Sequence, residues 1–427
     1  MPKLRDWTAS LVSRGTERAA PLIAKSKEWW ALLASKGRVY WISVVILIVV
    51  GIAISALLEE KNKYLEANYW WYQLLGRTFP GDPTVNDITL VLIGDEEYWK
   101  GELGHRVPIK RAYLAELVRA IADGNPAAIA LDFDFRSPTP DGRPWVEHPD
   151  YKDETKRFLE TIKEVAVICP VVLPTTVARD ERGSLIAESN VYNGFDWGTA
   201  EKSIFLGYIL HDEDMRLLPV RRALKAGPAE DSFVQAIIRA AKPNALPTLE
   251  RFEGHRSPPY GHYLPRQKFP WIPATQVLVG DKPFLKDKLA HKIVIVGGAW
   301  SQIVFGNRSK VDEWLTPVGL LPGVYIHANH VQAILCDRVY PRFPSVLVRL
   351  GEGALSLSVV AIFALAKTWP KQFLLASGVG LVLMGVNYVV LVNFGQYFDV
   401  LPPLATLAGH GIYEHFRDRR APPAEHK

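Results

Sequence analysis

The sequence is poor in sulfur, with two cysteines and three methionines among 427 residues. Two cysteines are too few for a small scaffold held together by disulfides. Cys169 and Cys336 could form one disulfide in an oxidising compartment, or they could remain two buried thiols that pack as small apolar side chains. Internal repeats and low-complexity tracts are also absent, which excludes repeat architectures.

Patterns typical of enzymes and of nucleotide-binding proteins are missing as well. No serine, cysteine, histidine and aspartate arrangement resembles a catalytic triad or dyad, and the histidines lack the spacing of zinc ligands. Gly297 and Gly298 follow a predicted strand without the further motif that phosphate binding requires, so we interpret them as a tight turn. We therefore expect a non-enzymatic protein without metal or cofactor.

Long hydrophobic runs are what the sequence has instead. One run covers 39–58, and three more, at 346–366, 373–394 and 400–416, follow a long polar stretch. Each is long enough, or nearly so, to cross a bilayer as a helix. The first lacks a small-residue cleavage site before Glu59, so we expect a retained anchor rather than a signal peptide. The sequence predicts four transmembrane helices around a large domain at 59–345.

Lysine and arginine set the predicted orientation. They are concentrated before the first run, in the short turn at 367–372 and in the tail at 417–427, which lie on one face if there are four spans. The positive-inside rule makes that face cytoplasmic, so we expect a bacterial inner-membrane protein with residues 59–345 in the periplasm. These segments also explain the net charge of +5, which gives no reason to expect nucleic acid. The basic amphipathic segment 1–38 could lie on membrane lipids or dock a partner helix.

The predicted periplasmic domain alternates between two patterns. Strand-like runs are followed by segments with helical periodicity, and this alternation predicts a layered α/β domain with a mostly parallel sheet beside an all-α transmembrane region. Strands are expected at 88–93, 127–135, 165–172 and 292–296, and helices at 109–122, 152–163, 232–241 and 324–335. The Pro-, Arg- and His-rich stretch 242–268 is expected to be a loop or an ordered excursion.

Carboxylates gather where two of the predicted strands end. Asp132 and Asp134 are two apart on one strand, so their side chains should share a face. Asp95 and Glu96 follow the first strand at what should be the neighbouring carboxyl edge, where open α/β sheets bind ligands. Oxygens converging there could hold a divalent cation or recognise a cationic ligand.

A structural interpretation of the same carboxylates stays open. They could cap helix N-termini, or they could pair with Arg111 and Arg136. The candidate ligand-binding residues are therefore Asp95, Glu96, Asp132, Asp134, Arg111 and Arg136.

Four other polar residues are expected to have structural roles. His327 and Asn329 lie at the start of a predicted helix, where His327 should bond the turn beneath it. Glu352 and Asn387 fall at the same shallow depth in two predicted spans, and a hydrogen bond between them would fix one helix against the other.

Several short segments resemble a known sensory module when read in order. They are Ile93-Gly94-Asp95-Glu96-Glu97, Ala130-Leu131-Asp132-Phe133-Asp134-Phe135, Asp212-Glu213-Asp214, Lys292 to Ala299, Thr316-Pro317 and, the most specific, Gly323-Val324-Tyr325-Ile326-His327-Ala328-Asn329. Together they resemble the second class of CHASE domain, the cyclase- and histidine-kinase-associated sensory extracellular module. The resemblance implies one anchor helix, a sensor over about 80–340, and three closing helices.

Two departures from that family shape the expected function. An aromatic turn of the family is replaced by Gly104-His105-Arg106-Val107-Pro108, and no cyclase, kinase or regulatory domain follows the last hydrophobic run. We therefore expect a sensor subunit that signals to a separate cytoplasmic effector, as a homo-oligomer or in a hetero-complex with other membrane subunits. The alternative is a scaffold whose outer domain is a docking platform in a larger inner-membrane assembly.

Overall fold

The computed structural model describes two compact units of the chain. One unit comprises 65–342 with 393–395, and the other comprises 1–64, 343–392 and 396–427. The described residues are 38, 41–42, 44–46, 48–50, 52–53, 69–70, 72–74, 83–104, 106–136, 150–181, 184–209, 214–223, 229–253, 258–304, 307–365 and 369–395. The segment 1–37, half of the first predicted span, the fourth predicted span and the tail therefore lie outside the description.

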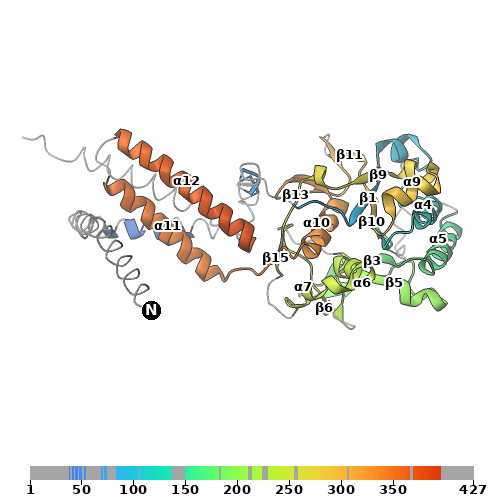
Figure 1. Ribbon diagram of the computed structural model, residues 1–427. Helices are drawn as coiled ribbons and strands as arrows, with labels where there is room; N and C mark the ends of the chain where they lie inside the picture. The colour runs from blue at the N-terminus through green and yellow to red at the C-terminus, as the bar shows by residue number, and fades with distance from the viewer. Residues whose placement is uncertain are drawn as a thin grey trace, which may run out of the picture. The chain divides into compact units, whose positions relative to one another are not determined.

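A seven-stranded sheet forms the centre of the first unit (Figure 1). Its strands are β1 (Ile88–Ile93), β2 (Ala128–Asp132), β3 (Val171–Arg179), β4 (Leu185–Ala187), β5 (Ile204–Ile209), β9 (Trp271–Pro273) and β10 (Ile293–Gly298). They run in the order β4-β3-β2-β10-β1-β9, with β5 also on β3. All pairs are parallel except β3 with β4. The predicted α/β class with a mostly parallel sheet is confirmed.

Helices cover the sheet because its central strands are apolar on both sides. Val91, Ile129 and Val296 belong to the core shared with α4 (Arg111–Asp123), α5 (Tyr151–Ala166), α8 (Ala274–Val279) and α9 (Lys282–Leu289). Alternate residues along a strand point to opposite faces. The other face of the sheet is contacted by α6 (Phe233–Ala241) and α10 (Gly323–Leu335).

The remaining elements of this unit are short. They are the helical turns η1 (Glu96–Lys100), η3 (Gly198–Ser203), η4 (Pro243–Ala245), α7 (Pro247–Glu250) and η5 (Arg266–Lys268), and the antiparallel pairs β6–β7 (Arg222–Ala223, Ala229–Glu230), β8–β15 (Tyr260–Gly261, Val339–Tyr340), β11–β12 (Ser301–Val304, Asn307–Lys310) and β13–β14 (Glu313–Thr316, Gly319–Pro322). The excursion predicted at 242–268 is thus ordered where described, with η4, α7, β8 and η5.

The predicted strand at 165–172 is wrong in its first half. Helix α5 continues to Ala166, and β3 begins only at Val171. Val165 and Ala166 pack in the same core as Phe158 and Ile162 of this helix. Their helical spacing therefore extends the apolar stripe of α5, whereas an apolar run read alone does not distinguish helix from strand.

The second unit contains the helices α11 (Ser345–Leu365) and α12 (Trp369–Phe394), which occupy two of the four predicted spans. Val44 of the first hydrophobic run packs with Val360 of α11. Within the part of the chain that the structure describes, no helix combines the length and the apolar character that crossing a bilayer requires. The predicted transmembrane region therefore stays a prediction.

Three sequence expectations concern individual side chains of these units. Glu352 accepts a hydrogen bond from Nη1 of Arg349 at 2.9 Å, and its predicted bond to Asn387, which is equally buried, stays a prediction. Cys169 and Cys336 are both free thiols, so they do not form a disulfide. Burial raises the pKa of Cys169 to about 11, which keeps this thiol protonated and unreactive.

Candidate functional site

The carboxyl ends of three central strands form one edge of the sheet. Strand β10 lies between β1 and β2, with Ile93 level with Gly298 and Asp132 level with Gly297. Because the strands are parallel, the loops that follow them all leave from this edge. The predicted carboxylates lie at the end of β2 or in these loops, and the structure gives them different partners.

The two acidic residues after β1 have structural contacts. Oδ2 of Asp95 accepts a hydrogen bond from Oγ of Ser301 at 3.0 Å, and its other oxygen accepts from the backbone N–H of the same residue. Glu96 is exposed and pairs with Lys100 at 3.3 Å. It is Glu97 that turns inward, where Oε2 accepts from the N–H of Gly94 at 3.0 Å and Oε1 accepts from Oγ1 of Thr275 at 3.1 Å.

Asp134 is not on a strand, because β2 ends at Asp132. The argument that Asp132 and Asp134 share a strand face is therefore wrong. Asp134 accepts hydrogen bonds from the backbone N–H of Arg136 at 3.0 Å and from its Nε at 2.9 Å. Arg136 also lies 3.5 Å from Glu188, so this group forms a partly exposed ion-pair network. This pairing of Asp134 with Arg136 is the one expected if the carboxylates have a structural role.

Asp132 faces helix α10 instead. Its Oδ1 lies 3.5 Å from Nε2 of His327, whose side chain is buried. A second carboxylate, on Asp312 in the turn between β12 and β13, lies beside them, and the backbone carbonyl of Asp312 accepts a hydrogen bond from the N–H of Gly323 at 2.9 Å. Asp132, Asp312 and His327 thus meet at the N-terminus of α10.

Asp312 is the carboxylate of this cluster whose ionised form is disfavoured. Burial and the nearby charge of Asp132 raise the pKa of Asp312 to about 6, although a hydrogen bond from Trp314 at 2.7 Å and the His327 ring oppose the shift. A carboxyl group with this pKa changes charge near physiological pH. A ligand that binds nearby can therefore alter the protonation of Asp312, which contacts the N-terminus of α10.

Gly297 and Gly323 let helix α10 approach the sheet. A Cβ on Gly297 would lie 2.7 Å from Cβ of Val324, and a Cβ on Gly323 would overlap the carboxylate of Asp312. Gly297 and Gly298 are residues of strand β10, so the prediction of a tight turn there is wrong. The glycines are needed for close packing of a helix against a strand.

The far side of α10 carries buried polar groups. Oδ1 of Asn329 accepts from the N–H of Leu264 at 2.6 Å, and its Nδ2 donates to the carbonyl of Tyr325 at 2.9 Å. Nε2 of His330 donates to the carbonyl of Met215 at 2.9 Å, which also accepts from the hydroxyl of Tyr263 at 2.6 Å. Burial lowers the pKa of His330 to about 3, so the ring is neutral with its proton on Nε2.

Met215 also connects α10 to Tyr69, which lies between the first hydrophobic run and strand β1. Its N–H donates to the hydroxyl of Tyr69 at 3.0 Å, and this hydroxyl donates to Oδ1 of Asp214 at 2.8 Å. Burial alone would raise the pKa of Asp214, but the charge and hydrogen bonds of Arg216 outweigh it and lower the pKa below its usual value. The buried network therefore holds an ionised carboxylate against Tyr69.

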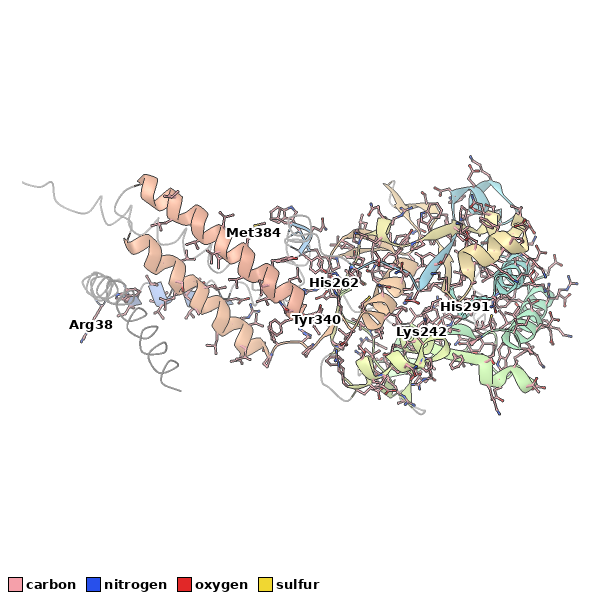
Figure 2. The ribbon with its side chains drawn as sticks, viewed as in Figure 1. Arg38, Lys242, His262, His291, Tyr340 and Met384 are labelled. Atoms are coloured by element: carbon pink, nitrogen blue, oxygen red, sulfur yellow. The ribbon has the colours of Figure 1, made fainter. Side chains whose placement is uncertain are left out.

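Tyr72 makes a second connection from the same helical segment. Its hydroxyl lies 3.4 Å from Nδ1 of His262 and accepts a hydrogen bond from the N–H of Tyr263 at 3.3 Å. His262, labelled in Figure 2, directly follows β8 and donates its backbone N–H to the carbonyl of Arg338 at 3.2 Å, just before β15. We call Tyr69, Tyr72, Asp214, Met215, Tyr263 and His330 the tyrosine network.

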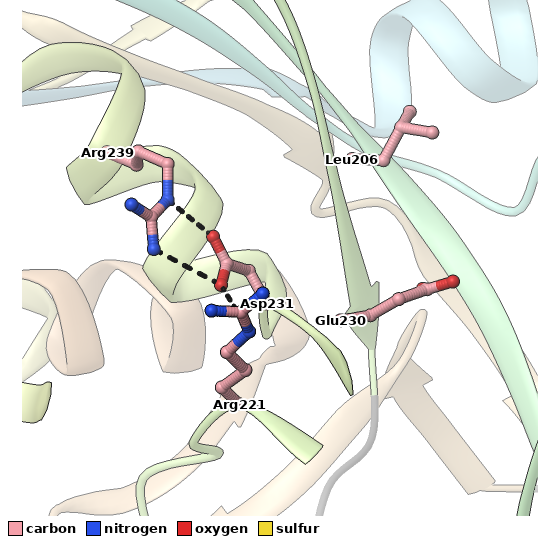
Figure 3. Close-up of a pocket in the computed structure, with 5 residues that line it drawn as sticks. All are labelled: Leu206, Arg221, Glu230, Asp231 and Arg239. Atoms are coloured by element: carbon pink, nitrogen blue, oxygen red, sulfur yellow. Dashed lines mark hydrogen bonds and ion pairs between the residues drawn. The ribbon is translucent and has the colours of Figure 1, made fainter. Parts of the chain in front are cut away.

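A cavity of about 370 Å³ lies away from both groups, beside β5 and the start of α6. Nε of Arg239 and Nε of Arg221 approach Asp231 at 2.6 and 3.7 Å, while the carboxyl of Glu230 points away from them (Figure 3). Glu250 and Glu253 also act on Arg239, so acids balance the two cations. The charge of this cavity favours no ligand class.

The described residues contain no group of three or more histidines, cysteines, aspartates and glutamates arranged to hold a metal ion. Comparison with known proteins gives one positive result, a match to the CHASE2 domain family over residues 43–367, which is more than half of the chain. No curated protein and no solved structure matches it.

Proposed function

Because the chain belongs to the CHASE2 domain family, a family of sensory domains, we propose that it is a receptor subunit of the bacterial inner membrane. Its α/β domain binds a ligand or an envelope partner in the periplasm and signals to a separate cytoplasmic effector. The four hydrophobic runs and the basic segments beside them support the membrane location and the orientation.

One observation carries the proposal: helix α10 joins the carboxyl edge of the sheet to both ends of the sensor domain. Its N-terminus contacts the Asp132–Asp312–His327 cluster, and His330 two turns later belongs to the tyrosine network. Tyr69 of that network follows the first hydrophobic run, and residues 336–344 lead from α10 to α11.

This arrangement supplies a physical route for a signal. Every residue from Gly323 to Ile334 is buried, so α10 cannot move without repacking its neighbours. A ligand that changes the charge at Asp312 or Asp132 therefore favours a different position of the helix. Signalling requires that the ligand bind the two positions with unequal affinity.

The role is non-enzymatic in this proposal. The polar groups at the edge are engaged in ion pairs and in helix packing, and none is paired as nucleophile with general base in the described residues. A receptor needs binding and coupling rather than chemistry.

Hydrogen exchange of the full-length protein in detergent tests the coupling. A low-molecular-weight extract of the cell envelope is added, and exchange is followed by mass spectrometry. We expect a fraction that raises the thermal midpoint and alters exchange in α10 and in 336–344. The Tyr69→Phe variant should still be stabilised by that fraction but should show a smaller change in 336–344.

The scaffold alternative predicts a different result. A docking platform would co-purify with other subunits in fixed stoichiometry, and no extract fraction would alter the exchange of α10. That combination would contradict the receptor proposal.

A further inference from the structure

Arg111, the first residue of α4, and Arg106, which precedes the helix, have buried donors without a partner among the described residues. Nε and Nη2 of Arg106 and Nε and Nη1 of Arg111 are all buried, and none of them forms a hydrogen bond within the part of the chain that the structure describes. Arg111 is only 1% exposed and Arg106 retains 11% of its side-chain exposure. Buried polar groups are nearly always hydrogen-bonded, and a buried cation with free donors is costly.

The site already holds one carboxylate. Oε1 of Glu154 accepts from Nη1 of Arg106 at 2.7 Å, and Oε2 accepts from the backbone N–H of Arg111 at 3.2 Å. Burial alone would raise the pKa of Glu154, but the hydrogen bonds and charge of Arg106 lower it. One carboxylate balances only one of the two guanidinium groups, because Lys110 pairs separately with Glu102.

The orientation of Arg106 suits a second oxyanion. With Nη1 engaged by Glu154, its Nε and Nη2 remain, and these two atoms donate in parallel from one edge of the guanidinium plane. This edge forms a two-pronged donor that matches the oxygens of a carboxylate or phosphate.

Two aromatic side chains hold the guanidinium group of Arg111 in place. Its guanidinium carbon lies 4.9 Å from the centre of the Phe135 ring and 5.3 Å from that of Tyr151, and Nη2 donates to the Tyr151 hydroxyl at 3.0 Å. The aromatic rings stabilise the cation without supplying an anion. Arg111 also begins α4, whose N-terminus carries the positive end of the helix dipole at the carboxyl edge of the sheet.

We propose that Arg106 and Arg111 form a binding site for a small oxyanion, a carboxylate or a phosphate group, which enters beside the partly exposed Arg106. Asp134 also acts electrostatically on Arg111, but it is engaged by Arg136. In the proposed receptor, this site makes the ligand an anion, and only this step rests on the proposed function. An anionic ligand is opposite in charge to the cationic ligand that the acidic residues alone suggest.

Anion titrations of the full-length protein in detergent test the site. Thermal unfolding is followed with sodium phosphate, sodium acetate and sodium succinate, each against chloride at constant ionic strength. We expect saturable stabilisation by at least one oxyanion that chloride does not give. Phosphate alone, the carboxylates alone, or both would each support the site and would identify its preferred group.

Arg106→Lys is the decisive variant, because it keeps the charge beside Glu154 but loses the two-pronged donor. We expect binding to weaken by about tenfold or more, as for loss of a charged hydrogen-bond pair. Arg119→Lys is the matched control, since Arg119 lies on α4, the helix that follows Arg106, and pairs with Glu164 at 2.9 Å. Equal affinity in Arg106→Lys and the wild type would overturn the proposal, as would stabilisation by chloride equal to that by every oxyanion.

Hydrogen exchange of the wild type keeps the test independent of how the variants fold. The stabilising oxyanion should protect peptides covering 106–118 and 150–158, and protection elsewhere alone would contradict the site. These results are separate from the receptor proposal, because anion binding to the purified protein does not depend on the membrane orientation.

Discussion

Nε2 of His327 lies 3.5 Å from Oδ1 of Asp132, and this contact joins helix α10 to the end of strand β2. Asp132 is level with Gly297 on the neighbouring strand, where α10 also packs most closely. The helix is therefore fixed to the sheet by a contact between these two polar side chains and by close packing at the same height. The predictions below concern this joint and the tyrosine network.

Gly297→Ala should destabilise the α/β domain by about 1–3 kcal/mol, the usual cost of overpacking a core. The added methyl group would lie 2.7 Å from Cβ of Val324, so either α10 or β10 must shift. Chemical denaturation measures the change. Gly378→Ala in α12 is the control, because nothing lies within 4 Å of the added atom there, and alanine favours helix. An unchanged midpoint in Gly297→Ala would show that α10 is not tightly packed on β10.

Tyr69→Phe should cost about 1–3 kcal/mol, because it removes a partner of the buried Asp214 carboxylate and of the Met215 N–H. Tyr113→Phe is the matched control, since the hydroxyl of Tyr113 is buried without a hydrogen-bond partner among the residues described, and its removal should be neutral or stabilising. Thermal unfolding compares the two. Equal loss in both variants would show that the tyrosine network adds nothing to stability.

Asp312 should make the folded state less stable as pH rises. Its folded pKa of about 6 lies above its ordinary value of 3.8, so the unfolded chain loses the proton first, and the contribution of Asp312 to stability falls between about pH 4 and 6. Asp312→Asn should remove this contribution and raise the free energy of unfolding at pH 7 by about 1–3 kcal/mol. Glu96→Gln, at an exposed carboxylate that pairs with Lys100, is the control and should keep the contribution of Asp312. A wild-type profile in Asp312→Asn would contradict the raised pKa.

His330 should act in the opposite direction. Its folded pKa of about 3 lies below the ordinary 6.5, so the unfolded chain binds the proton first, and stability falls as pH drops from about 6.5 towards 3. His330→Gln should remove this component, so that the fall caused by Asp312 dominates between pH 4 and 6. Denaturant titrations at several pH values measure both effects, and no change in slope for His330→Gln would show that the ring is not buried in neutral form.

Apolar patterning predicted most of the fold. Strands β1 and β10 and helices α4 and α10 lie within about two residues of the predicted bounds, because their runs are long and bounded by turn residues. The end of α5 was placed wrongly because Val165, Ala166 and Val167 are compatible with either structure. Gly297 and Gly298 were assigned to a turn because glycine spacing does not reveal that a helix crosses the strand there.

The candidate site was less accessible from sequence because its partners come from distant segments. Asp312 lies in a turn with φ of 49°, far along the chain from Asp132, and no motif links the two. Tyr69 belongs to no motif, and its distant partner Asp214 cannot be found from the sequence. Arg111 was interpreted as a possible partner of acids and Arg106 as part of a turn, whereas the buried donors of both become visible only once burial and hydrogen bonds are known.

The placement of the α/β domain outside the cytoplasm is the central claim, and labelling of a single introduced cysteine tests it most directly. Val279 is 84% exposed, so Val279→Cys would be accessible to a membrane-impermeant maleimide. Cells with a permeabilised outer membrane are labelled before and after lysis, with the unsubstituted protein as background for Cys336 and Ser10→Cys as the cytoplasmic control. We predict that Val279→Cys is labelled in intact cells and Ser10→Cys only after lysis. Labelling of Val279→Cys only after lysis would contradict the receptor account.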